Sequence, residues 1–150
     1  MSDVFVGRQP IFDRNSEVFG YELLFRNGSS GGAEIAPGAG DRATAEVLLH
    51  TVQDIGTPHL MNGLPAFVNL GRGLLVREYP LPLSPNELII ELLEDVPPDG
   101  AVLRGLKRLS DAGYRIALDD FRYRKELWRR AMSWNLRTLP VSPCRWMPVL

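Results

Sequence analysis

The most informative stretch of the chain is Gly20-Tyr21-Glu22-Leu23-Leu24-Phe25-Arg26, which sets one carboxylate and one guanidinium four residues apart in an otherwise apolar run. Directly before it, Arg8-Gln9-Pro10-Ile11-Phe12-Asp13-Arg14-Asn15 is typical of a short strand and a turn. We therefore predict strands over residues 4–12 and 18–26, joined as an antiparallel hairpin.

Apolar runs and helix signals alternate along the chain after this hairpin. The patterns predict helices at about 42–55, 72–79 and 99–112, and strands at 66–70, 87–93 and 114–118. Strands separated by helices imply right-handed crossovers and a parallel sheet. The predicted class is α/β, a partial modified TIM (βα) barrel in which an N-terminal hairpin with an antiparallel strand precedes the βα units.

Polar residues stand at the ends of the later apolar runs. They are Asn69 after Ala66-Phe67-Val68, Glu91 after Leu88-Ile89-Ile90, and Asp119 and Asp120 after Ile116-Ala117-Leu118. Oxygen ligands at the carboxyl ends of barrel strands suit a site for Mg²⁺ or Ca²⁺. Each position also has a simpler interpretation, since Asn69 is typical of a turn and the acidic residues are typical of solvated loops.

Glu22 and Arg26 are open to two interpretations each. Glu22 lies between apolar neighbours, so it is either an exposed strand residue or a buried carboxylate that is paired or binds a cation. Arg26 is either a solvated residue at a strand end or a phosphate clamp that uses its planar donor fork.

Composition excludes several classes of protein. There is no run of 18 apolar residues that would span a membrane, and the N-terminus lacks a basic, apolar leader. Cys144 is the single cysteine, so no disulfide framework or thiolate metal site is expected, and we predict a cytoplasmic protein. His50 and His59 lack metal-ligand spacing and are predicted to be structural.

Charge divides the chain after Phe121. Residues 1–121 hold 10 basic and 17 acidic side chains, a balance of −7, whereas residues 122–150 hold seven basic and one acidic, a balance of +6. All three tryptophans lie in the second part, which shows no helix or strand period and contains three prolines. We predict that 1–121 is one structural unit and that 122–150 is a basic, Trp-containing tail, disordered or out of frame. The alternative is that Trp134, Trp146 and Leu150 fold back over the sheet edge.

Five motifs together resemble an EAL domain, the cyclic di-GMP phosphodiesterase fold, and most of all the degenerate EAL domain that precedes an HDOD domain. They are Val6-Gly7-Arg8-Gln9-Pro10-Ile11-Phe12-Asp13-Arg14, Gly20 to Arg26, Ala66-Phe67-Val68-Asn69-Leu70, Glu91-Leu92-Leu93-Glu94, and Gly113-Tyr114-Arg115-Ile116-Ala117-Leu118-Asp119-Asp120-Phe121. The resemblance covers about residues 4–121 and is to the N-terminal half of such a domain.

The resemblance implies a role for each of these polar residues. It assigns Glu22, Asn69, Glu91, Asp119 and Asp120 to a site for Mg²⁺ or Mn²⁺. It further implies that Arg26 contacts a phosphate of cyclic di-GMP and that Glu94 stabilises a catalytic loop. The chemistry of the family would be attack of metal-activated water on a phosphodiester.

Departures from the family pattern qualify this activity. The signature Glu-Ala-Leu is here Glu22-Leu23-Leu24, and Arg122 replaces the glycine expected after Asp119-Asp120-Phe121. The later lysine, aspartate, glutamate and glutamine of the family have no counterpart before Leu150. We therefore expect a truncated, non-catalytic signalling module that acts through protein contacts. The alternative is a metal-dependent phosphodiesterase whose second half is missing.

The expected partners follow from the same features. We expect cyclic di-GMP as a candidate ligand, together with protein partners of a signalling pathway. Self-association is expected because a half barrel leaves strand edges uncovered. No membrane or nucleic-acid partner is expected, since the basic tail lacks a nucleic-acid-binding motif.

Overall fold

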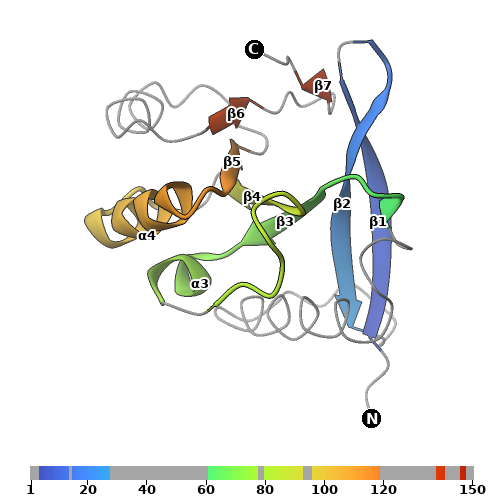
Figure 1. Ribbon diagram of the computed structural model, residues 1–150. Helices are drawn as coiled ribbons and strands as arrows, with labels where there is room; N and C mark the ends of the chain where they lie inside the picture. Colours follow the sequence, from blue (N-terminus) through green and yellow to red (C-terminus); the bar gives the residue numbers. More distant parts are fainter. Residues whose placement is uncertain are drawn as a thin grey trace.

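The computed structural model describes residues 4–13, 15–27, 61–77, 80–92, 96–118, 138–140 and 146–147. Their strands form one seven-stranded sheet in the order β6-β5-β4-β3-β2-β1-β7 (Figure 1). The strands are β1 Val4–Asp13, β2 Val18–Asn27, β3 Ala66–Leu70, β4 Leu88–Leu92, β5 Arg115–Leu118, β6 Thr138–Pro140 and β7 Trp146–Met147. The helices are α3 Arg72–Val76 and α4 Gly100–Asp111.

The predicted N-terminal hairpin is confirmed. β1 and β2 pair antiparallel, with Val4 opposite Asn27 at the open end. Their turn is held by Asp13, whose Oδ1 accepts hydrogen bonds from the backbone N–H groups of Asn15 at 2.8 Å and Glu17 at 3.0 Å. A short acidic side chain that bonds its own turn is the usual reason for Asp at such a position.

The other strands pair in parallel, as the alternation of strands and helices predicts. β2 pairs with β3, β3 with β4, and β4 with β5, all in parallel. The register sets Asn69 of β3 directly opposite Glu91 of β4. The partial α/β barrel with one antiparallel strand is therefore the observed architecture.

Two apolar clusters lie on opposite faces of the sheet. The larger joins β2–β5 to the helices; its buried members include Leu23, Val68, Leu70, Leu75, Ile90, Leu92, Val102, Leu106 and Ile116. The smaller consists of Ile11, Phe67, Ile89 and Ala117, with Phe19 packed against it. Since successive strand residues point to opposite faces, each strand contributes to both clusters. We call the face of the smaller cluster the inner face and the helix-covered one the outer face.

α4 begins after its cap, one residue later than predicted. Asp99 is the N-cap, and its Oδ1 accepts hydrogen bonds from the N–H groups of Ala101 and Val102, both at 2.9 Å. The helix ends before Gly113, which has a φ of +98°. β4 also begins one residue later, at Leu88, because Glu87 accepts hydrogen bonds from Ser84 in the preceding turn. α3 ends at Val76 rather than near residue 79.

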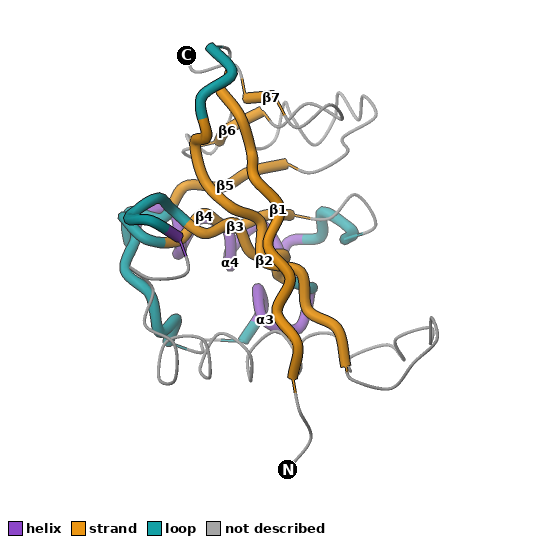
Figure 2. Tube along the Cα trace, turned by 90° about the vertical axis from the view of Figure 1, so that its right-hand side faces the viewer, coloured by secondary structure: helices purple, strands orange, loops and turns teal. Residues whose placement is uncertain are grey.

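The sheet curls toward a barrel. β6 pairs with β5 at one edge and β7 pairs with β1 at the other, and both views place β6 and β7 near each other (Figures 1 and 2). A flat seven-stranded sheet would separate its edge strands by roughly 29 Å. The six Cα steps from Pro140 to Trp146 span at most about 22 Å, so the edges have approached each other.

Other predictions concern residues outside the described ones. The helix predicted at 42–55 is one of them, as are most residues of the segment 122–150. Within that segment the structure describes 138–140 and 146–147, which are strands of the sheet, and the disordered or out-of-frame tail stays a prediction. Among the described residues, no helix has the length and apolar character needed to cross a membrane.

Candidate functional site

Three polar side chains from adjacent strands lie on the inner face. Glu22 in β2 alternates with Tyr21 and Leu23, which pack in the outer cluster. Asn69 follows Phe67 by two residues in β3, and Glu91 follows Ile89 by two in β4. Because residues two apart in a strand share a face, all three belong to the same side of the sheet as the inner cluster.

Burial of the two carboxylates is nearly complete. Glu22 is 2% exposed and Glu91 is 1% exposed, whereas Asn69 is partly buried. The buried alternative for Glu22 is therefore the observed one. A buried carboxylate is stable only with hydrogen bonds, a counter-charge or a cation, so the burial of two in neighbouring strands indicates a specialised site.

Asn69 connects the two acidic residues. Its Nδ2 donates a hydrogen bond to Glu22 Oε1 at 3.2 Å, and the register places Asn69 beside Glu91. Three buried oxygens accept no hydrogen bond from the described residues: Glu22 Oε2, Asn69 Oδ1 and Glu91 Oε2. Glu22 and Glu91 have further interactions of their own. The Asn69 amide thus uses its donor toward Glu22 and leaves a buried oxygen available as a ligand.

The donor set suits a hard divalent cation. Mg²⁺, Mn²⁺ and Ca²⁺ prefer carboxylate and amide oxygens, and two carboxylates supply the charge that balances one such ion. The buried Asn69 Oδ1 is the observation that favours this fit. The described part of the chain contains no group of three or more His, Cys, Asp and Glu residues placed to hold a metal ion.

The remaining predicted site residues lie beyond this cluster. Asp119, Asp120 and Glu94 are outside the described residues, and their roles stay predictions. Arg26 belongs to β2, and its contact with a phosphate likewise stays a prediction. The structure therefore brings together three of the seven residues that the sequence singled out.

Two features of the inner face were missed by sequence reasoning. Arg115 lies over the ring of Phe19, with its Cζ 5.7 Å from the ring centroid, and burial lowers the pKa of its guanidinium. Phe67 and Ile89 precede Asn69 and Glu91 by two residues and form a buried apolar floor beside the polar side chains. The signal for the floor was present, since both residues share the period of 2 with the site residues.

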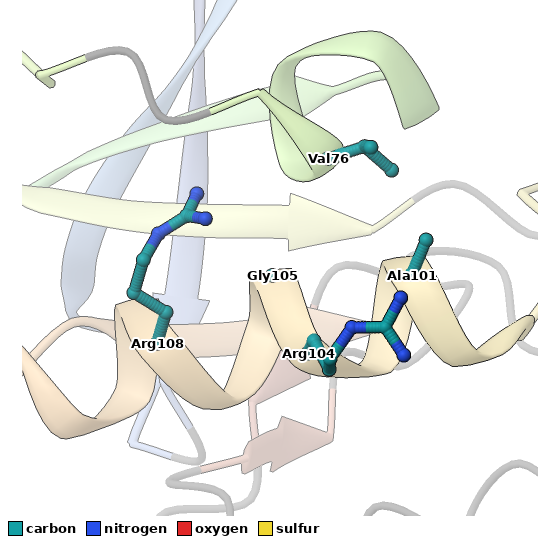
Figure 3. A pocket seen from close by; sticks show the side chains of 5 residues that line it. All are labelled: Val76, Ala101, Arg104, Gly105 and Arg108. Atoms are coloured by element: carbon teal, nitrogen blue, oxygen red, sulfur yellow. The ribbon is translucent and has the colours of Figure 1, made fainter.

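A separate pocket of about 210 Å³ lies on the outer face, between α3 and α4 (Figure 3). It is lined by Val76, Ala101, Arg104, Gly105 and Arg108. Arg108 donates hydrogen bonds to Leu75 O at 3.4 Å and Arg77 O at 3.1 Å, which fastens α4 to the end of α3. The pocket has no carboxylate and is on the opposite face from Glu22, so it is not part of the candidate cation site.

Two curated proteins resemble this chain in sequence. The chain is 39% identical over 118 residues to the uncharacterized protein YuxH of Bacillus subtilis, and 33% identical over 134 residues to the cyclic di-GMP phosphodiesterase CdgJ of Vibrio cholerae. These matches cover 79% and 89% of this chain, but only 28% and 31% of the relatives. No protein-family model matches the chain.

Solved structures with an EAL domain share the fold. The Bacillus subtilis protein YkuI, which has an EAL domain and was solved with cyclic di-GMP and calcium, gives a TM-score of 0.57 at 19% identity. The EAL enzyme Bd1971, bound to cAMP and cyclic di-GMP, gives 0.55 at 20% identity. This chain has the fold of part of an EAL domain. It covers 40% of each of those chains, and they cover 89% and 79% of it, respectively.

The match with CdgJ includes part of the C-terminal segment of the chain. The stretch matched with CdgJ is 134 residues long, which is 13 more than residues 1–121 contain. The matched stretch therefore continues past Phe121. Together with strands β6 and β7, this places part of 122–150 within the sheet and within the match.

Proposed function

We propose that this chain is an EAL-type module of cyclic di-GMP signalling that binds a divalent cation, Mg²⁺ or Mn²⁺, and acts in the cytoplasm through protein contacts. The observation that carries the proposal is that Glu22, Asn69 and Glu91, from three adjacent strands, lie together on the inner face with both carboxylates buried. The likeness to CdgJ and to two structures with bound cyclic di-GMP supports the choice of nucleotide.

In this proposal each residue has a separate task. Glu22 and Glu91 supply the negative charge, and Asn69 supplies a neutral oxygen while its Nδ2 orients Glu22. The floor of Phe67 and Ile89 keeps water from one side, which strengthens the attraction between carboxylate and cation. Asp119 and Asp120 add ligands after β5, Arg26 contacts a nucleotide phosphate, and Glu94 supports the neighbouring loop.

A bound divalent cation would supply polarisation of a phosphoryl oxygen and a lowered pKa for bound water. We expect no hydrolysis by the chain alone, because a two-metal reaction needs both ions in a fixed geometry.

The second candidate is a metal-dependent cyclic di-GMP phosphodiesterase completed by residues beyond those of this chain. The observation that favours it is the 33% identity to CdgJ, combined with the burial of Glu22 and Glu91 at the positions the family resemblance gives to metal ligands. A protein that had lost all use of a cation would gain stability by replacing such buried carboxylates with apolar residues.

Calorimetric titration with Mg²⁺ and Mn²⁺, followed by a cyclic di-GMP turnover assay, tests both candidates. The proposal predicts cation binding that is lost in Glu22→Ala, without measurable turnover. Glu17→Ala is the matched control, since Glu17 is exposed in the β1–β2 turn. Turnover by the chain that disappears in Glu22→Ala but persists in Glu17→Ala would contradict both candidates, since each leaves the chain alone inactive, and absence of cation binding would refute the proposal.

A further inference from the structure

Gly20 in β2 lies close against Pro65, just before β3, and Phe67 within β3. A Cβ atom added at Gly20 would lie 2.6 Å from the carbonyl oxygen of Pro65 and 2.7 Å from Cε2 of Phe67. The same carbonyl accepts a hydrogen bond from the N–H of Tyr21 at 3.0 Å, so it is fixed in place. Any side chain at residue 20 would therefore push β2 away from β3 or turn the Phe67 ring.

Phe67 is the neighbour of Glu22 across this strand pair. The two residues are partners in the β2–β3 register, and Phe67 is fully buried on the inner face. Its ring meets that of Phe19 edge to face, with centroids 6.1 Å apart and an interplanar angle of 62°. The ring is thus packed between Phe19 and the bare backbone of Gly20.

The contact between Glu22 and Asn69 depends on the same strand spacing. Relief of the 2.6 Å contact to an ordinary separation of 3.4 Å requires a movement of about 0.8 Å. A movement of that size along the line of the 3.2 Å bond from Asn69 Nδ2 to Glu22 Oε1 would stretch it to about 4 Å, beyond hydrogen-bond range.

We propose that Gly20 and Phe67 are positioning residues that set Glu22 against Asn69 in the geometry for cation binding. This inference rests on the proposed function, because it takes the Glu22–Asn69 pair as part of a cation site. Neither residue touches the cation: Gly20 permits the close approach of the strands, and the Phe67 ring holds the neighbouring Glu22 side chain in register. Residues that orient ligands in this way commonly change metal affinity by 10–100-fold when they are altered.

The test is Mn²⁺ affinity, measured by electron paramagnetic resonance on the full chain, with thermal unfolding monitored by circular dichroism. Gly20→Ala should weaken Mn²⁺ binding by about tenfold or more. Gly7→Ala is the matched control in the neighbouring strand, because a Cβ there has its nearest neighbours at 3.6 and 3.7 Å. Gly7→Ala should leave the affinity unchanged.

A double-mutant cycle with Phe67→Leu distinguishes positioning from general destabilisation. If Gly20 acts partly through the ring, Gly20→Ala costs less affinity in the Phe67→Leu background than in the wild type. Equal costs in the two backgrounds, or wild-type affinity in Gly20→Ala, would overturn the inference.

Two other results bear on the inference: a Gly20→Ala variant that is not folded, and a wild-type chain that binds no Mn²⁺. If Gly20→Ala does not unfold cooperatively, the test is a comparison of Phe67→Leu with Ile89→Val, a smaller truncation in the same floor. Only Phe67→Leu should weaken Mn²⁺ binding. Equal Mn²⁺ affinities of the two variants would overturn the inference. If the wild-type chain binds no Mn²⁺ at all, the proposed function itself fails, a result distinct from wild-type binding that Gly20→Ala leaves intact.

Discussion

Replacement of Glu22 by Gln should stabilise the cation-free protein while it removes cation binding. Glu22 and Glu91 are both buried and lie on either side of β3, so their strand axes are about 10 Å apart. With an effective dielectric constant of about 20, two unit charges repel by roughly 1.7 kcal/mol at that spacing, and by more at the shorter separation that a shared cation requires. Gln keeps the oxygen that accepts the Asn69 bond and removes one of the charges.

The expected gain is roughly 1–2 kcal/mol, or a rise of roughly 2–8 °C in Tm for a chain of this size. It should appear in thermal unfolding with a chelator present. Addition of Mn²⁺ should raise the Tm of the wild type and leave that of Glu22→Gln unchanged, because a ligand stabilises only the state that binds it. Glu17→Gln, an exposed neutralisation in the turn, should show neither effect.

A lower Tm of Glu22→Gln would contradict this prediction. If Glu22→Gln lowers the Tm by several degrees in the chelator, the Glu22 carboxylate belongs to a favourable structural interaction rather than to a cation site. In that case the charge-repulsion argument for the inner face is wrong.

Two other perturbations test the packing of the helices. Gly105→Ala should destabilise the chain by about 1–3 kcal/mol, since its Cβ would lie 2.0 Å from Leu75 O of α3, whereas Gly100→Ala, with only the Arg104 guanidinium nearby, should be neutral in urea unfolding. The pKa of Asp99 is lowered below 3.8, chiefly by the hydrogen bond from the Val102 N–H and then by Arg72. The contribution of Asp99 to the free energy of unfolding is therefore present above about pH 4 and is lost as the pH falls through the lowered pKa. In urea titrations between pH 5 and 2, Asp99→Asn should lose less stability with falling pH than the wild type.

Local patterns were enough to predict the hairpin and the parallel strands. Asp13 and Asn15 mark the turn between two apolar runs, and the β3 boundaries coincide with the predicted 66–70. The start of α4 was displaced because the Asp99 side chain binds the N–H groups of Ala101 and Val102, which makes it a cap rather than a helical residue.

The environment of the site was harder to predict because it depends on distant strands. The sequence is consistent with either an exposed or a buried Glu22. Its burial depends on Phe67 and Asn69, which lie 45 and 47 positions later in the chain. Likewise Gly20 was notable only as a glycine within a strand, a weak signal of close backbone approach. The close contact between Gly20 and the carbonyl oxygen of Pro65 can be recognised only after β2 and β3 are paired.

The central claim is that Glu22, Asn69 and Glu91 together bind a divalent cation. A crystal structure of the chain grown with Mn²⁺, with an anomalous difference map, tests it most directly. We expect a peak within about 2.6 Å of Asn69 Oδ1 and of a carboxylate oxygen of both Glu22 and Glu91. A well-ordered inner face with no peak there, or a peak held by other residues while these three oxygens stay buried without it, would contradict the account.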